Sequence, residues 1–305
     1  MRKIIIFIFC GLVFAGCKQD PMVENDDNQQ IVVFFSSQSI LASKLKSAAT
    51  ETEKIINKVI LFGFDASDNF VPKSKWIKEV TNLSTSLELE DVNRKVKTIW
   101  AIANPTTAME NIIPEKVADL TKQTASYPND NPPTSPFLMS GKGAVAGYSA
   151  NIKLFFAVAK VKIISDGFQI TSVEVQKTPD KAFVFDDNLF NWKTGDPPIV
   201  PKVPTGSGRV TYASPTTLPD PLVFYVAEND ATTTANSTKF VVKGTLDNVP
   251  IDPYTIELKI DQKIIPIKRN TCYTVTISPV SQSTGTVTIS IPDWEEGEND
   301  DHSIK

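Results

Sequence analysis

Apolar and polar residues alternate one by one in the last third of the chain, and this period of two most constrains the fold. The alternation covers three segments, 254–261, 273–277 and 287–291. Successive side chains of a β-strand point to opposite faces, so each segment predicts a strand with one packed face and one wet face. Short polar turns between the segments favour an antiparallel meander.

Denser apolar runs predict further strands that are covered on both faces. These runs lie at 58–64, 98–103 and 152–164. Helical signals are sparse. Pro114 and Glu115 open one helical stretch that extends to about Gln123, because proline and an acidic residue favour the first turn of a helix. Residues 50–56 predict at most a helical turn or two, so the chain as a whole is predicted to be all-β.

The pair Asp166-Gly167 follows the longest apolar run and is the best place for a domain boundary. Roughly 290 residues after a removed leader suits two domains of ordinary size. The boundary divides this part into 31–165 and 166–305, two β-rich halves of similar length. We therefore predict two β-sandwich domains in tandem with few short helices.

The first residues predict export and a lipid anchor. Arg2 and Lys3 precede an apolar run at 4–14, which suits a secretory signal and is too short to span a bilayer. The run ends in Phe14-Ala15-Gly16-Cys17, where small residues before a cysteine indicate a lipoprotein signal; an ordinary signal peptide with an incidental cysteine is the alternative. Residues 1–16 are then the signal peptide, Cys17 carries diacylglycerol, and 17–30 form a flexible tether.

Composition leaves little room for enzymatic chemistry. The one histidine, His302, lies in an acidic tail, so catalytic triads and histidine metal sites have almost nothing to use. Cys272 is the single cysteine of the mature chain and is interpreted as a small core residue. A net charge of −4 and the predicted export of the chain argue against nucleic-acid binding. We expect no cofactor and no metal.

Three weaker patterns have a plainer interpretation. Acidic residues crowd the segment 293–298, where a solvated charge run is favoured over a pair of glycosidase carboxylates. Asp65 and Asp68 lack the spacing of a calcium loop and are interpreted as a turn after a strand. The four tryptophans are scattered, and Trp100 lies in a predicted core strand; Trp76 or Trp192 is a minor candidate for stacking on a sugar.

A short apolar strand at 29–39 stands apart from the others. It lies between the polar tether and a segment rich in lysine, alanine and threonine, and no hairpin partner follows it closely. A strand this short is not stable alone, so it must complete a sheet built by distant segments.

Several segments together resemble the fimbrillin family, the pilus subunits of Bacteroidales. The resemblance rests on segments in the same order across nearly the whole mature chain. They are NKVILFGFDASDNFV at 57–71, IWAIANP at 99–105, FLMSGKG at 137–143, LFFAVAKVKI at 154–163, FYVAEN at 224–229, IKRNTCYTVTI at 267–277 and VTISIPDWEEGE at 287–298. Each segment alone is only a strand with a turn, and their order and spacing make the match specific.

The resemblance implies structural work at the cell surface. Fimbrillins are similar to two stacked transthyretin-like β-sandwiches, and they reach the outer membrane as lipoproteins. Polymerising members lose an N-terminal segment that contains the first strand. A strand from a neighbouring subunit then fills the groove, which is β-augmentation. The resemblance therefore implies other fimbrial subunits as partners, the outer membrane as an attachment, and a host protein or glycan as a possible receptor.

By the same resemblance, residues 31–46 are a candidate removable segment. Its strand would be formed by Ile31, Val32, Val33, Phe34 and Phe35. Cleavage in the family follows an arginine, but 40–55 holds none, and Lys44 and Lys46 stand in the matching place. An arginine-specific protease would not cut there. Either a lysine-tolerant protease acts, or the segment stays, as would suit an anchor subunit. The candidate donor strand carries Val287, Ile289 and Ile291.

The leading hypothesis is thus a fimbrial structural subunit that supports adhesion and is located in the outer membrane or fimbrium. A non-polymerising anchor or accessory lipoprotein is one alternative. A surface lipoprotein that binds glycans is another, from a different class of function, and an enzyme is a distant third.

Overall fold

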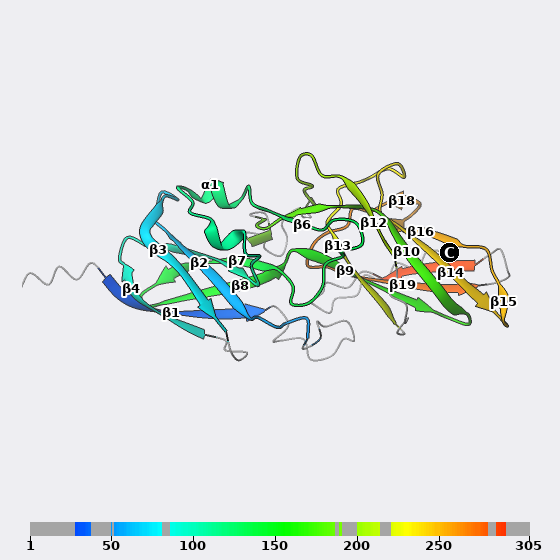
Figure 1. Ribbon diagram of the computed structural model, residues 1–305, viewed down its shortest axis with the longest axis horizontal. Coiled ribbons are helices and arrows are strands. Elements are labelled where there is room, and N and C mark those ends of the chain that lie inside the picture. The colour runs from blue at the N-terminus through cyan, green and yellow to red at the C-terminus, as the bar shows by residue number, and fades with distance from the viewer. Residues whose placement is uncertain are drawn as a thin grey trace, which may run out of the picture.

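The computed structural model describes residues 28–37, 50, 52–80, 86–186, 189–190, 200–213, 221–279 and 285–290. These residues form an elongated molecule built almost wholly of strands, with β1 to β4 gathered at one end and β14 to β16 at the other (Figure 1). No helix in the described ranges is both long enough and apolar enough to cross a membrane. The all-β sandwich prediction is confirmed, whereas the number of domains and their boundaries stay predictions.

The elements follow one another in a simple order. The first strands are β1 Asn28–Ser37, β2 Lys58–Phe64, β3 Phe70–Glu79, β4 Ser86–Asn93, β5 Thr98–Ala103, β6 Thr124–Ser126, β7 Met139–Ala146, β8 Ser149–Phe156 and β9 Val158–Ser165. The later strands are β10 Gln169–Pro179, β11 Lys181–Phe183, β12 Arg209–Ala213, β13 Leu222–Ala227, β14 Lys239–Leu246, β15 Val249–Pro250, β16 Tyr254–Glu257, β17 Lys259–Ile260, β18 Lys263–Ile264, β19 Cys272–Pro279 and β20 Gly285–Ser290. Among the described residues, the 3-10 turn Met109–Asn111 and α1 Val117–Leu120 are helical, as are 189–190.

Seven strands form the first sheet, in the order β3-β2-β5-β7-β8-β1-β4. The sheet curls, so that its edge strands β3 and β4 approach within 8 Å between Cα atoms. Its concave face encloses the first core, which contains Ile31, Val33, Val59, Leu61, Leu89, Val92, Ile99, Ala101, Met139, Ile152, Leu154 and Phe156. One curled sheet thus supplies both walls around this core.

The strands β2 and β5 are buried on both faces, as their apolar runs predict. Val59 and Leu61 face the first core, whereas Ile60 and Phe62 face the opposite side. An outer cluster covers that side; it is made of Ile60, Phe62, Phe64, Trp100, Ile102, Met109, Val117, Leu120, Ala125, Val184 and Phe185. Trp100 is 2 % exposed, and its ring lies 5.2 Å from that of Phe185 between centroids, which confirms its core position.

A second sandwich encloses the second core. One layer has the order β13-β9-β19-β20, and the other has the order β12-β10-β14-β15 with β16 also paired to β14. The second core contains Val161, Ile163, Val173, Val175, Tyr212, Phe224, Phe240, Val242, Ile256, Tyr273, Val275 and Ile277. Strand β9 follows β8 after one residue, Ala157, but it pairs with β13 and β19. Residues 158–165 therefore lie in the second sandwich.

The apolar run at 152–164 holds parts of two strands, because β8 ends at Phe156 and β9 begins at Val158 in another sheet. One sequence prediction about strands needs correction. The predicted meander is wrong for its first segment. Strand β16 pairs with β14 in the opposite layer, and β17 pairs with β18; only β19 and β20 pair as neighbours. Alternation shows that one face of a strand is packed, but it does not show which sheet the strand joins.

The turn after β2 is a tight side-chain capped turn. The carboxylate oxygen Oδ1 of Asp65 accepts the backbone N–H of Ser67 at 2.8 Å and that of Asn69 at 2.9 Å. These two bonds lower the pKa of Asp65, with Asn69 as the larger cause. The interpretation of this segment as a turn is confirmed.

Candidate functional site

Strand β1 lies inside the first sheet between β8 and β4. It runs parallel to β8, with Val33 opposite Ala150 and Phe35 opposite Ile152. It runs antiparallel to β4, with Ile31 opposite Leu89. The sheet that the isolated N-terminal strand completes is therefore the one around the first core.

Alternate side chains of β1 fill the first core. Ile31 and Val33 are 0 % exposed and Phe35 is 7 % exposed, whereas Phe34 on the other face is 43 % exposed. Burying a side chain of this size contributes about 1.5–3 kcal/mol relative to exposure. Val32 lies on the outer face with Phe34 and is half-buried. Strand β1 is thus a core element on one face and a surface element on the other.

The neighbouring strand β4 depends on β1 for its place in the sheet. Within the described residues β4 is an edge strand, and β1 is the strand to which its ladder connects. Loss of β1 would expose one ladder edge of β8 and one of β4, together with the apolar positions between them. An edge of this kind pairs readily with any available strand.

The residues that would decide removal of β1 lie largely outside the described ranges. Cys17, Lys44 and Lys46 are among them, so lipidation and processing stay predictions. The chain is described again at Thr50, and from Thr52 it runs into β2. The predicted helical turn is present here, since the backbone N–H of Glu53 donates to the carbonyl of Thr50 at 3.0 Å.

Glu53 lies buried between the two halves of the molecule. Its carboxylate is 2.6 Å from the Nζ atom of Lys160 on β9, and both side chains are at most 5 % exposed. The hydroxyl of Tyr225 on β13 donates a hydrogen bond to the same carboxylate oxygen. Burial, followed by this hydrogen bond, raises the pKa of Tyr225. We call Glu53, Lys160 and Tyr225 the Glu53 clamp.

The clamp sits where the first and second cores meet. The ring of Tyr225 packs against Phe137, with centroids 4.2 Å apart. Cys272 is paired in register with Lys160 and is completely buried. Burial raises the pKa of the Cys272 thiol, and the nearby charge of Lys160 opposes this shift. The interpretation of Cys272 as a core residue is confirmed. The clamp therefore joins the chain that leaves β1 to the sheet of the second half.

Asn104 fixes the same segment from the first sheet. Its backbone is left-handed, with φ 53°, a conformation that asparagine tolerates better than most residues. Its amide Nδ2 donates to the carbonyl of Ile55 at 2.7 Å and to that of Phe137 at 2.8 Å. Its Oδ1 accepts the backbone N–H of Asn57 at 2.9 Å. The side chain of this asparagine, from the segment IWAIANP, thus hydrogen-bonds three backbone groups.

The candidate donor strand lies at a sheet edge. Strand β20 pairs with β19 only, among the strands described, with Ile289 opposite Val275 and Val287 opposite Ile277. Ile289 is buried and Val287 is half-buried, while Ile291 falls outside the described residues. A strand held by one ladder is released more easily than one held by two.

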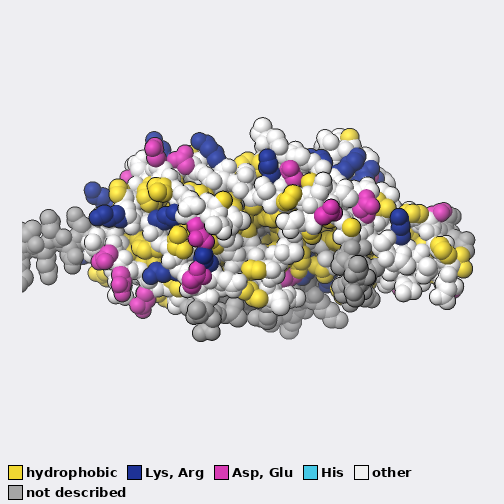
Figure 2. All heavy atoms as spheres, in the orientation of Figure 1, with side chains coloured by type: hydrophobic (Ala, Val, Ile, Leu, Met, Phe, Trp, Pro, Cys, Tyr) yellow, Lys and Arg dark blue, Asp and Glu magenta, His cyan; other side chains and the backbone are white. Residues whose placement is uncertain are grey.

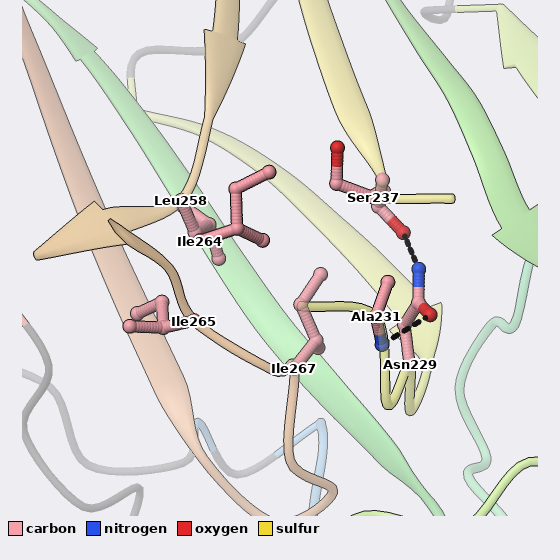
Figure 3. Close-up of a pocket in the computed structure, with 8 residues that line it drawn as sticks. Asn229, Ala231, Ser237, Leu258, Ile264, Ile265 and Ile267 are labelled. Atoms are coloured by element: carbon pink, nitrogen blue, oxygen red, sulfur yellow. Dashed lines mark hydrogen bonds between the residues drawn. The ribbon is translucent and has the colours of Figure 1, made fainter. Parts of the chain in front are cut away.

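The pocket beside Asn229 is too small for a ligand. Figure 3 shows one pocket, where Ile264 lies beside Leu258 and Ile267 lies next to Ala231, with Asn229 and Ser237 on the other side. Its volume is about 10 Å³, room for no more than one water molecule. Asn229 itself is satisfied, since its amide donates to Thr238 and its Oδ1 accepts the backbone N–H of Ala231.

A larger pocket of about 240 Å³ lies beside Glu228 and Asp186. Glu228 is 1 % exposed and forms an ion pair with Arg269, whose Nε atom donates at 3.0 Å. Burial raises the pKa of Glu228, and Arg269 opposes this shift. The pair ties β13 to the approach of β19, which is a structural role.

The surface mixes both signs of charge. Figure 2 shows lysine and arginine side chains interspersed with acidic ones over the visible face. Trp76 packs partly buried against the first core. Trp192, Trp294 and the acidic cluster at 293–298 lie outside the described residues.

One protein family matches part of the chain in sequence. Residues 41–181 match the family of major fimbrial subunit proteins (FimA). None of the curated proteins compared matches the chain in sequence.

Solved structures share the fold over most of the chain. The tip fimbrial protein Mfa3 from Porphyromonas gingivalis is 12% identical with a TM-score of 0.56, over 87% of this chain and 100% of that chain. A fimbrilin from Porphyromonas gingivalis W83 is 14% identical with a TM-score of 0.54, over 88% and 98%. A fimbrial assembly protein from Parabacteroides distasonis ATCC 8503 is 16% identical with a TM-score of 0.55, over 89% and 98%. The resemblance to the fimbrillins is confirmed. At these identities the structural likeness shows the fold alone, and the family match supports a fimbrial protein at the cell surface.

Sequence reasoning located some parts of this fimbrillin-like chain and missed others. It identified β1 as a separate strand, but not its partners β8 and β4. It also missed the Glu53 clamp. One signal was available, because Lys160 is a charged residue inside the apolar run AVAKVKI, and a buried charge needs a partner.

Proposed function

We propose that this protein is a structural subunit of a cell-surface fimbria that assembles by donor-strand exchange and supports adhesion. The observation that carries the proposal is the position of β1, a strand that fills the first core and separates β8 from β4. N-terminal processing removes this strand, and a strand of a neighbouring subunit takes its place. The partners are other fimbrial subunits, and the lipid on Cys17 holds the unprocessed chain at the outer membrane.

The vacated place would select a strand by its hydrogen bonds and its side-chain spacing. The ladder edges of β8 and β4 supply hydrogen bonds to any extended backbone. The first core accepts apolar side chains at every second position, as it does for Ile31, Val33 and Phe35. Val287, Ile289 and Ile291 repeat that spacing and are the donor that we propose.

Processing must use lysine rather than arginine. Residues 40–55 contain no arginine, and a pocket built for a planar guanidinium does not accept an ammonium equally well. We therefore propose cleavage after Lys44 or Lys46 by a protease that accepts lysine.

The N-terminus of the protein recovered from cells tests the proposal. Polymeric material should begin at Leu45 or Ser47 and should contain no peptide from β1. Lys44→Ala combined with Lys46→Ala should leave the chain lipidated and absent from polymers, whereas Lys18→Ala in the tether should change neither property. Polymers built from chains that retain β1 would contradict strand exchange.

Two observations favour a second role, that of a non-polymerising anchor. Strand β1 is held by ladders on both sides, and the segment after it lacks the expected arginine. An anchor keeps both its lipid and its own strand. In that case, a lipidated Cys17 would be found in every recovered chain, and depletion would detach fimbriae without removing their main subunit.

A further inference from the structure

The Glu53 clamp lies just downstream of the proposed processing sites. Its ion pair and hydrogen bond hold Glu53 against β9 and β13 of the second half. Both charged side chains are buried, so separating them would leave an unpaired charge in the interior. The side chain of Glu53 is therefore tightly held.

The backbone around the clamp is bonded at successive residues. The hydroxyl of Ser135 donates to the carbonyl of Thr52 at 2.6 Å. The backbone N–H of Lys54 donates to the carbonyl of Thr50 at 3.3 Å. Asn104 binds the carbonyl of Ile55 at 2.7 Å. The Lys54–Ile55 peptide bond thus lies within a stretch whose polar groups are engaged on both sides.

The identity of the residue does not distinguish the proposed processing sites, Lys44 and Lys46, from Lys54, because all three are lysines. A protease that accepts lysine at Lys44 or Lys46 meets the same side chain a few residues later. Cleavage requires the local backbone to open, and segments with many tertiary contacts open rarely. The difference between these lysines must therefore come from the structure around them.

We propose that the Glu53 clamp protects the Lys54–Ile55 bond from lysine-directed proteolysis and so sets the downstream limit of N-terminal processing. The second part rests on the proposed function. A chain cut after Lys46 keeps Glu53 and stays attached to the second core. Six residues then precede Glu53, positions 47–52, and reach about 20 Å at most. This stub is shorter than the ten residues of β1, so it cannot replace the whole strand, and the groove is open to another molecule.

Limited proteolysis of the purified full chain with a lysine-specific endoprotease tests the protection. The readout is the rate at which a fragment beginning at Ile55 forms, measured by mass spectrometry. In the wild-type chain this fragment should form only as the whole protein unfolds. Glu53→Ala should raise the rate at least about tenfold, because cleavage follows the population of the open segment. Tyr225→Phe removes only the hydroxyl and should raise the cleavage rate less than Glu53→Ala does. It provides the test of the clamp if Glu53→Ala does not fold.

Two further variants separate the clamp from a general loss of stability. Val242 lies in the second core and is not part of the clamp. If Val242→Ala and Glu53→Ala lower the global stability equally, the fragment beginning at Ile55 should form much more slowly from Val242→Ala. Glu53→Gln combined with Lys160→Met removes both charges and should restore part of the protection that Glu53→Gln alone loses.

Rapid release of the Ile55 fragment from the wild-type chain would overturn the proposal, as would equal rates in Val242→Ala and Glu53→Ala at matched stability. The result is independent of assembly. Chains from cells that all keep a lipidated Cys17 would refute the proposed function, while slow cleavage after Lys54 would still establish the protection.

Discussion

The backbone N–H of Val32 donates to the carbonyl oxygen of Tyr148 at 2.9 Å. The N–H and C=O groups of one strand residue point to the same side, so Val32 presents both groups to β8. Toward β4, Val32 and Glu88 then form a pair without mutual hydrogen bonds. In such pairs the Cα atoms lie about 4.5 Å apart and the side chains are close. This is the position at which β1 can be locked in place.

A disulfide between these two positions should block assembly. Val32→Cys with Glu88→Cys places two thiols on the outer face at a spacing that a disulfide accepts. If β1 must leave, the oxidised variant should stay monomeric even after cleavage of the linker, and reduction should restore polymerisation. Size-exclusion chromatography and non-reducing gels measure both states. The single variants serve as controls. Polymerisation of the fully oxidised variant at the wild-type rate would rule out strand removal.

Two adjacent phenylalanines should differ sharply in their contribution to stability. Phe35 is 7 % exposed and Phe34 is 43 % exposed. Phe35→Ala should lower the free energy of unfolding by about 3–5 kcal/mol because it leaves a cavity in the first core. Phe34→Ala should lower it by less than about 1 kcal/mol. Urea denaturation of the full chain measures both values, and similar losses for the two variants would show that β1 does not hold this register in solution.

Gly141 should not tolerate a side chain. A Cβ atom at this position would lie 2.0 Å from the carbonyl oxygen of Lys153 on β8. Gly141→Ala should therefore push β7 and β8 apart and lower the free energy of unfolding by about 1–3 kcal/mol or more. Lys142→Ala on the same strand adds no atom between β7 and β8. It loses the contact of its ammonium with Trp100, whose ring centroid lies 4.8 Å away, and should lower the free energy of unfolding by less than Gly141→Ala does. Thermal denaturation of both variants provides the comparison.

The turn at Asp65 should contribute less to the free energy of unfolding in acid than at neutral pH. The pKa of Asp65 is lowered from 3.8 by bonds from Asn69 and Ser67. A lowered carboxyl pKa stabilises the fold above the unfolded value and loses this effect as the pH falls through the folded value. The difference in stability between wild type and Asp65→Asn should therefore be constant near neutral pH and shrink below about 3.8. Urea denaturation at pH 7 and at pH 3 measures it, and a difference that grows in acid would be inconsistent with this cause.

The sequence predicted strands most accurately where burial is complete. The bounds of β2 and β5 agree with the apolar runs at 58–64 and 98–103, because a strand packed on both faces needs apolar residues at consecutive positions. The glycines of the segment FLMSGKG were recognised only as part of a motif. Their physical reason, the close approach of β8 to Gly141, is visible only in the structure.

The candidate site was predictable in part. The alternation of Ile31, Val33 and Phe35 marks a strand with one buried face, and the motif order indicates the fimbrillin family. The Glu53 clamp was not predictable, because a buried charge pair joins residues that are distant in sequence and depends on how two sheets meet.

The sequence by itself determined that the chain is all-β, which side chains alternate into a core, and which family it resembles. The tertiary structure alone decided that β1 lies parallel to β8 and antiparallel to β4, and that Glu53 reaches Lys160 and Tyr225. The physical reason is that local patterns set the faces of a strand, whereas every strand offers the same backbone donors and acceptors at its edges. Which edges pair is therefore decided when the core assembles.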